Sequence, residues 1–329
     1  MSDYVGIQGQ AVINTGTDPA TGTTGVNGQV WYNNATYTFK ISNEFPNGAW
    51  ATGGNLGTAR ERLAGAGTQT AGLAFGGSIS GNSEATEEYD GSAWTAGGNL
   101  AQGRWSLGGA GTQTAGLAFG GTTPPASNLT EEYDGSSWTA GGTMGTAKYR
   151  FAGLGTQTAG LAAGGVTTIV LAGTEEYDGS SWTAGGNLGT ARAQLAGAGT
   201  QTAGLAFGGF IPPTTPTTTA TEEYDGSSWT AGGNLNTGRQ QLAGAGTQTA
   251  GLAFGGTPPV TTLGLLTEKY DGTSWTAVGN MNTGRRYLAG AGTQTAGLAF
   301  GGEYGGVPIA NNTEEFNSPG FTINTLTTT

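Results

Sequence analysis

The sequence contains no histidine and no cysteine among its 329 residues. It therefore lacks an imidazole base, a thiolate nucleophile, a disulfide and the nitrogen and sulfur ligands of ordinary zinc sites. Adjacent carboxylates such as Glu131 and Glu132 point to opposite faces of a strand, so they cannot flank one scissile bond as a glycosidase pair must. Most enzyme mechanisms are thereby excluded, and we expect no catalytic residue, no metal site and no cofactor.

Basic residues are also scarce: Lys and Arg number 11 against 22 Asp and Glu, which gives a net charge of -11. A nucleic-acid binder needs a basic surface to replace counterions, so nucleic acid is excluded as a partner. No apolar run approaches the length of a membrane span, so we expect no membrane insertion. The first residues, Met1–Gly6, lack the basic and apolar regions of a secretory signal, which predicts folding in a cytoplasm.

Glycine, in contrast, is abundant. It accounts for 66 of the 329 residues. In average proteins only about one residue in fourteen is glycine. Such a composition can indicate a low-complexity chain, but the sequence also has 8 Trp, 11 Tyr and 11 Phe. Disordered chains are poor in aromatic residues because they have no core to hold them. The composition therefore indicates a folded protein rich in tight backbone turns.

An octapeptide, Gly-Thr-Gln-Thr-Ala-Gly-Leu-Ala, recurs six times at steps of 44 to 47 residues, and a tryptophan recurs at the same steps. A period in the mid-forties with Gly-Gly, Tyr and Trp is typical of the four-stranded blades of β-propellers. The octapeptides begin at Gly67, Gly111, Gly155, Gly199, Gly246 and Gly292, and the tryptophans are Trp50, Trp94, Trp138, Trp182, Trp229 and Trp275.

Each repeat predicts four strands, which we name A to D. In one copy they are residues 195–199, 203–207, 221–225 and 229–230, with a long loop between B and C. Asp-Gly between C and D is a strong signal for a tight hairpin turn. Strand A consists of small residues, which suits a position where blades converge on a narrow axis.

The order Arg, short strand, apolar strand ending in Gly-Gly, loop, Tyr-Asp and then Trp resembles the kelch motif over residues 55–321. The resemblance implies an all-β fold, a kelch-like β-propeller of four-stranded blades. The repeat sequence also resembles kelch-like arrays in virion and tail-fibre proteins of marine, cyanophage-like bacteriophages. The segment that carries this resemblance is Thr-Glu-Glu-Tyr-Asp-Gly-Ser-Ser-Trp-Thr-Ala-Gly-Gly-Asn-Leu. Gly28–Asn33, followed by Thr38–Lys40, is similar to short β-modules of phage fibres.

The blade count follows from the strands. Strands A and B occur in six copies, whereas the C–D pair occurs seven times, with an extra Glu44-Phe45 before Trp50 and a degenerate last pair that includes Phe316. Residues 28–42 are predicted to form a hairpin of the same length as the A–B unit of residues 63–77, so we predict that residues 28–52 form a degenerate first blade. Seven blades are therefore favoured, with six as the alternative.

These boundaries give a domain plan. Residues 1–27 lack the repeat and are rich in Gly and Thr, which predicts an N-terminal arm that could serve for attachment. Residues 28–329 are assigned to the propeller, with the degenerate blade over 28–52 and six kelch-like repeats over 53–329.

The six copies differ from one another mainly in the B–C loops and in the residue pair before strand A. In an up-and-down blade, both connections emerge on the same face, and variable loops on a rigid scaffold often bind ligands. Neutral sequence divergence of exposed loops is the other explanation of these differences, but it accounts less well for the aromatic and charged residues beside the axis. We therefore predict ligand contacts from Arg62, Trp105, Tyr149, Arg150, Arg286 and Tyr287.

Cations and tryptophans repeat with the blades. A cation occurs at one equivalent position of every copy, where it could capture an anionic ligand such as an acidic glycan or pair with a strand C carboxylate such as Glu87 or Glu88. Repetition of both partners favours pairing. The repeated tryptophans are expected to pack between blades, and we do not expect the Asp-Gly turns to bind calcium. The cations are Arg60, Arg104, Lys148, Arg192, Arg239 and Arg285.

The resemblance and the missing catalytic groups together predict a non-enzymatic bacteriophage virion protein, such as a tail fibre, head fibre or similar appendage. One propeller face would adhere to a host surface glycan or protein, and residues 1–27 would contact other virion proteins. The absence of a signal peptide fits assembly in the host cytoplasm and localisation in the virion. The sequence is also compatible with a homo-oligomer. The alternative is an intracellular kelch-type interaction scaffold that binds a peptide at its axis.

Overall fold

A computed structural model of the chain describes residues 13–15, 30–33, 38–45, 48–212, 217–258, 264–305, 309–318 and 320–325. These ranges contain 28 strands and no helix, so the predicted all-β class is confirmed. None of the described residues belongs to a helix long and apolar enough to cross a membrane. The chain divides into two compact units, residues 50–316 and residues 1–49 with 317–329.

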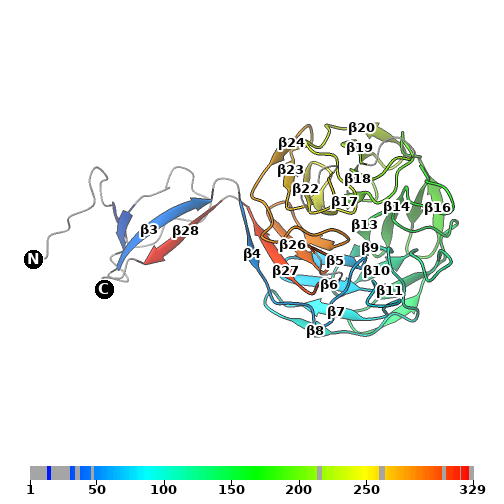
Figure 1. Ribbon diagram of the computed structural model, residues 1–329, viewed down its shortest axis with the longest axis horizontal. Helices are drawn as coiled ribbons and strands as arrows, with labels where there is room; N and C mark the ends of the chain where they lie inside the picture. Colours follow the sequence, from blue (N-terminus) through cyan, green and yellow to red (C-terminus); the bar gives the residue numbers. More distant parts are fainter. Residues whose placement is uncertain are drawn as a thin grey trace, which may run out of the picture. The chain divides into compact units, whose positions relative to one another are not determined.

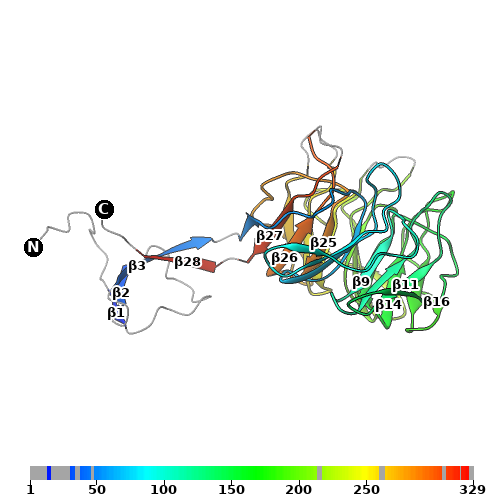
Figure 2. The ribbon, with the colours of Figure 1, turned by 90° about the horizontal axis from the view of Figure 1, so that it is seen from below.

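Residues 50–316 form a β-propeller whose blades surround a common axis, shown face-on in Figure 1 and from the side in Figure 2. Each blade is a sheet of four antiparallel strands, and five blades use four consecutive strands of the chain.

The first two of these blades consist of β5 (Ala64–Thr68), β6 (Ala71–Phe75), β7 (Thr86–Tyr89) and β8 (Trp94–Ala96), then β9 (Gly108–Gly111), β10 (Gly116–Phe119), β11 (Thr130–Tyr133) and β12 (Trp138–Ala140). The third and fourth consist of β13 (Ala152–Thr156), β14 (Ala159–Ala163), β15 (Thr174–Tyr177) and β16 (Trp182–Gly185), then β17 (Ala196–Thr200), β18 (Ala203–Phe207), β19 (Thr221–Tyr224) and β20 (Trp229–Ala231). The fifth consists of β21 (Ala243–Thr247), β22 (Ala250–Phe254), β23 (Thr267–Tyr270) and β24 (Trp275–Ala277).

The sixth blade joins the two ends of the propeller. Its strands are β25 (Ala289–Gly292), β26 (Ala296–Phe300), β27 (Thr313–Asn317) and, as the outer strand, β4 (Ala49–Thr52) from before the first repeat. Figure 1 shows β4 beside β27, at opposite ends of the colour scale. The propeller therefore has six blades, and the prediction of seven, with residues 28–52 as a degenerate first blade, is wrong.

The contacts of Trp50 explain why the propeller has six blades rather than seven. Its ring packs against Phe254 and Phe316, with centroids 5.1 and 5.3 Å away, and its indole nitrogen donates to Thr267 Oγ1 at 2.9 Å. Every repeated tryptophan donates the same bond to a threonine of the preceding blade, so Trp50 completes the last blade. The earlier residues Glu44 and Phe45 belong to a different sheet.

That sheet belongs to the second unit. It contains β1 (Ile13–Thr15), β2 (Val30–Asn33), β3 (Thr38–Phe45) and β28 (Gly320–Thr325) in this order. β1 and β2 pair in parallel, and the other two pairings are antiparallel. The hairpin predicted within residues 28–42 is therefore present as β2 and β3, but outside the propeller. The attachment role of residues 1–27, most of which lie outside the described residues, stays a prediction.

The propeller core lies between neighbouring blades. Leu73 and Phe75 of β6 pack with Tyr133 and Trp138 of the next blade, and all four side chains are buried. Strand A can carry little more than backbone: a Cβ added to Gly65 would lie 2.6 Å from Phe300 Cζ and 2.8 Å from the Gly290 carbonyl oxygen. The small residues predicted beside the axis are thus required by the close approach of the inner strands.

The repeated tryptophans pack between blades, as predicted. Trp138 contacts Phe75 of the preceding blade at a centroid distance of 4.9 Å, and its indole nitrogen donates to Thr86 Oγ1 at 2.9 Å. The same bond links each of the others to the preceding blade. Trp50, Trp138, Trp229 and Trp275 are buried, and Trp94 and Trp182 are partly buried.

The repeated cations pair with strand C carboxylates, so the pairing alternative is confirmed. Each buried cation lies 2.8 to 3.4 Å from the first glutamate of the following strand C. Arg60 Nη1 also donates to the carbonyl oxygens of Gly76 and Ala85, at 3.1 and 2.5 Å, which ties the B–C loop to the blade. The pairs are Arg60–Glu87, Arg104–Glu131, Lys148–Glu175, Arg192–Glu222, Arg239–Glu268 and Arg285–Glu314.

A tyrosine in strand C of five blades bonds to the preceding blade. Tyr133 Oη, for example, donates to Glu88 Oε1 at 2.6 Å, and Tyr270 Oη to Glu223 Oε1 at 2.5 Å. Burial, and then the bond to a carboxylate, raises the pKa of each phenol to about 12. The five are Tyr89, Tyr133, Tyr177, Tyr224 and Tyr270.

A titration of phenolate absorbance should therefore resolve five tyrosines that ionise near pH 12. Because their pKa in the unfolded chain is about 10, these bonds contribute their full stability below that pH. The contribution is lost as the pH rises through about 12. Tyr270→Phe should remove one tyrosine from this late group, and ionisation of all tyrosines near pH 10 would contradict the assignment.

Candidate functional site

The two variable parts of each repeat lie on one face of the propeller, as predicted. The first residue of the pair before strand A forms a β-bridge with the start of the B–C loop of the same blade. We call this side the variable face. The bridges are Glu61–Ser78, Trp105–Thr122, Tyr149–Val166, Ala193–Phe210, Gln240–Thr257 and Arg286–Glu303.

The opposite face consists of near-identical turns whose polar groups bond within the propeller. Gln113 Nε2 donates to the carbonyl oxygens of Gly72 and Tyr89, at 3.1 and 2.7 Å, and so links two blades. The Asp134 carboxylate accepts bonds from Ser136 and Ser137, which lower its pKa to about 2. Among the described residues, no group of three His, Cys, Asp or Glu is placed to hold a metal ion.

The second residue of each variable pair belongs to a closed ring around the axis, which we call the axial ring. Each backbone N–H donates to the carbonyl oxygen of the equivalent residue in the preceding blade, over distances of 2.7 to 3.0 Å. The last bond, from Arg62 N to Tyr287 O at 2.8 Å, closes the cycle. The six members are Arg62, Ser106, Arg150, Gln194, Gln241 and Tyr287.

All six axial ring residues have left-handed backbone conformations, with φ between 53° and 61°. In the part of the chain that the structure describes, every other residue with a positive φ is glycine. A residue with a side chain costs roughly 1–3 kcal/mol in such a conformation, and it persists where the surrounding structure enforces it. Here the cyclic hydrogen bonds enforce it.

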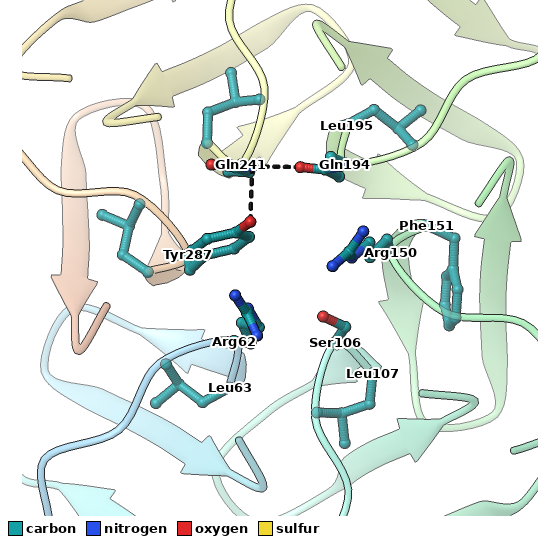
Figure 3. Close-up of a pocket in the computed structure, with 12 residues that line it drawn as sticks. Arg62, Leu63, Ser106, Leu107, Arg150, Phe151, Gln194, Leu195, Gln241 and Tyr287 are labelled. Atoms are coloured by element: carbon teal, nitrogen blue, oxygen red, sulfur yellow. Dashed lines mark hydrogen bonds between the residues drawn. The ribbon is translucent and has the colours of Figure 1, made fainter. Parts of the chain in front are cut away.

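The axial ring residues project their side chains around the mouth of a pocket, which we call the axial cup (Figure 3). The cup has a volume of about 130 Å³. The next residue of each blade also lines it, which places apolar side chains against the polar ones. These six are Leu63, Leu107, Phe151, Leu195, Leu242 and Leu288.

The two halves of the axial ring differ in how their polar groups are used. Gln241 Nε2 donates to Gln194 Oε1 at 2.5 Å and to Tyr287 Oη at 2.8 Å, as the dashed lines in Figure 3 mark. Arg62 and Arg150 lie on the other side, and their Nε atoms are buried without a hydrogen-bond partner among the described residues. Arg62 Nη1 lies 3.5 Å from Glu61 Oε1, whereas Arg150 forms no ion pair with any described residue.

Trp105 and Tyr149 line a second pocket beside the cup, which we call the aromatic groove. It has a volume of about 480 Å³ and also includes Pro124 and Pro125 of a B–C loop. The two rings meet edge to face, with centroids 6.3 Å apart. The groove adjoins the cup, since the Arg62 guanidinium carbon lies 5.1 Å from the Trp105 ring centroid and that of Arg150 lies 5.4 Å from that of Tyr149.

The structure therefore brings five of the six predicted site residues together. Arg62, Arg150 and Tyr287 line the cup, and Trp105 and Tyr149 line the groove. Arg286 lies outside both pockets, where its Nε donates to the Glu303 carboxylate. Their role as ligand contacts stays a prediction.

Sequence reasoning missed three members of the axial ring, namely Ser106, Gln194 and Gln241. It selected residues by aromatic or charged chemistry, and these three are small or neutral. The signal that could have found them is repeat register, because all six occupy the second position of the pair before strand A.

No protein-family model matches the chain, and no curated protein is significantly similar to it. The fold is a six-bladed β-propeller of four-stranded blades. The likeness of its repeat to the kelch motif and to bacteriophage arrays therefore stays a prediction from the residues.

Proposed function

We propose that this chain is a non-enzymatic recognition protein that binds its ligand at the axial cup and the aromatic groove. One observation carries the proposal: the axial ring keeps six side chains at positive φ, where the described chain otherwise uses glycine. Those side chains add nothing to the backbone bonds that close the ring. Strained residues of this kind cluster at ligand clamps and functional sites, so the side chains are retained for what they contact.

The use of the repeated polar groups favours binding over catalysis. Glu131 lies 3.1 Å from Arg104 Nη2, and its neighbour Glu132 accepts a bond from Tyr177 Oη at 2.5 Å. The two carboxylates thus point to opposite faces and serve the scaffold, as the sequence predicts. A rigid frame whose polar groups are already paired, with one face free to vary, suits recognition.

We place this recognition on a bacteriophage virion, as a tail fibre, head fibre or similar appendage that adheres to a host surface glycan or protein. The amino-acid sequence of the repeat supports a virion location, because it resembles the arrays of virion and tail-fibre proteins. Residues 1–27 would contact other virion proteins. Mass spectrometry of purified particles tests the setting: the chain should copurify with them, whereas recovery only from the soluble host fraction would favour an intracellular interaction scaffold.

Glycine substitutions in the axial ring should separate binding from folding. Arg150→Gly and Gln194→Gly remove a side chain while keeping the left-handed backbone and its hydrogen bonds. Relief of strain and the added freedom of the unfolded chain oppose each other, so we expect the free energy of unfolding to change by less than about 1 kcal/mol. Binding to host cells or to a glycan array should be lost.

The matched control is Thr70→Ala. Thr70 is exposed on a turn of the opposite face, so this variant should bind as the unaltered protein does. Urea unfolding measures stability in all three variants, and the binding assay is repeated on the same samples. Unchanged binding by both glycine variants would remove the axial cup as the site, and loss of binding by Thr70→Ala would place it on the other face.

A further inference from the structure

The lining of the axial cup is cationic. It includes the guanidinium groups of Arg62 and Arg150 and, among the described residues, no carboxylate. Arg150 forms no ion pair with a described residue, and Arg62 Nη1 lies 3.5 Å from Glu61 Oε1, which does not line the cup. Charged donors bind anionic acceptors most strongly. The positive charge of the cup, which no carboxylate among its described lining residues balances, therefore favours an anion.

The shape of the cup restricts that anion. A volume of about 130 Å³ accommodates one small group rather than a chain segment. Apolar side chains such as Leu107 and Phe151 form part of the lining, so a free hydrated ion would lose water that they cannot replace. The cup thus suits a carboxylate or a sulfate ester attached to an organic body, with the Ser106 hydroxyl as a further donor.

The aromatic groove is where that body would lie. Trp105 contacts Arg62 and Tyr149 contacts Arg150, so a ligand whose charge sits between the two arginines reaches the groove directly. The groove offers aromatic rings and prolines, and a volume of about 480 Å³ that can hold a sugar ring. Flat aromatic surfaces supply large contact areas to such rings.

Backbone bonding at the groove favours a saccharide over an extended acidic peptide. Trp105 and Thr122 exchange backbone bonds of 3.2 and 2.9 Å, and Tyr149 and Val166 exchange bonds of 3.1 and 2.9 Å. These residues therefore present no open strand edge, which a peptide needs in order to add as a strand. Recognition must come from side chains, as it does for a ring with an anionic substituent.

We propose that the axial cup and the aromatic groove together form a site for an anionic saccharide. The carboxylate or sulfate ester lies between Arg62 and Arg150, and the sugar ring packs against Trp105 and Tyr149. This assignment rests on the proposed recognition function and specifies its ligand class.

The test is isothermal titration calorimetry of the full chain with matched oligosaccharides. Oligogalacturonate and a sulfated oligogalactan are the charged probes, and neutral oligogalactan of equal length is the control. We expect at least one charged probe to bind roughly 10- to 100-fold more tightly than the neutral one. Which of the two binds identifies the anionic group as carboxylate or sulfate.

Arg150→Gln and Arg62→Gln should each remove most of this preference. Glutamine is the native residue at the equivalent Gln194 and Gln241, so the axial ring accepts it without loss of fold. Arg286→Gln is the control, because it makes the same change of charge on the same face but outside both pockets. It should leave the affinity for the charged probe within about twofold.

Three results would overturn the anionic-saccharide assignment. They are equal binding of neutral and charged probes, failure of both charged probes to bind, and an equal loss of affinity in Arg286→Gln and Arg150→Gln. An acidic peptide that binds where the charged saccharides fail would assign the site to a protein ligand. The recognition function is judged separately by the glycine variants, whose loss of binding to host cells does not depend on which ligand class is correct.

Discussion

Trp138→Ala is expected to lower the free energy of unfolding by roughly 3–5 kcal/mol, the range for truncation of large buried aromatic residues. Only 9% of Trp138 is exposed. Its ring centroid lies 4.9 Å from that of Phe75 in the preceding blade and 4.9 Å from that of Tyr133 in its own. Alanine would leave a cavity between two blades and remove the bond to Thr86 Oγ1.

Urea unfolding followed by circular dichroism measures this loss, and Trp138→Phe is the matched control. Phenylalanine keeps part of the ring packing and removes the indole N–H, so its cost should fall to roughly 1–2 kcal/mol. A loss below about 1 kcal/mol for the alanine variant would mean that the ring does not hold the two blades together.

Glu268→Ala should have an effect of similar size, about 3–5 kcal/mol, because it breaks a buried ion pair from one side. Arg239 is fully buried, Glu268 is 2% exposed, and Arg239 Nη2 lies 2.9 Å from Glu268 Oε1. Burial lowers the pKa of Arg239, and the nearby Glu268 charge opposes that shift. Without the carboxylate, the guanidinium would remain buried and uncompensated.

The chain itself supplies the matched comparison. Lys148 occupies the equivalent position of another blade, where its Nζ lies 3.4 Å from Glu175 Oε1 and donates to the Ala162 and Gly173 carbonyl oxygens. Arg239→Lys keeps the charge and should therefore cost less than about 2 kcal/mol in the same urea assay. If Arg239→Lys proved more costly than Glu268→Ala, carbonyl bonding rather than charge compensation would dominate this position.

Much of the fold could be predicted because its features repeat. A cation and a glutamate that recur together in every copy, such as Arg60 and Glu87, indicate a pair, and a recurring tryptophan indicates an interface between blades. The blade count could not be obtained in this way. Glu44 and Phe45 precede Trp50 much as Glu and Tyr precede each later tryptophan, so local pattern suggests a hairpin where the chain instead pairs β4 with β27.

The candidate site was predictable only in part, for a different reason. Residue chemistry identified Arg62 and Arg150, but nothing in a glutamine such as Gln194 signals a left-handed backbone held by a ring of bonds. Arg286 was selected by its charge. Its partner, Glu303, lies in a B–C loop of irregular length and sequence, so the ion pair could not be inferred from the repeat.

The axial ring has a consequence for how this protein can change. Its backbone bonds hold six Cα positions around the axis with side chains as different as Arg, Ser, Gln and Tyr. Substitutions there alter what the surface displays without requiring compensating changes elsewhere. New ligand specificities can therefore arise by single amino-acid substitutions, one blade at a time. The six axial ring positions are likewise the rational choice for randomisation in a binding library on this scaffold.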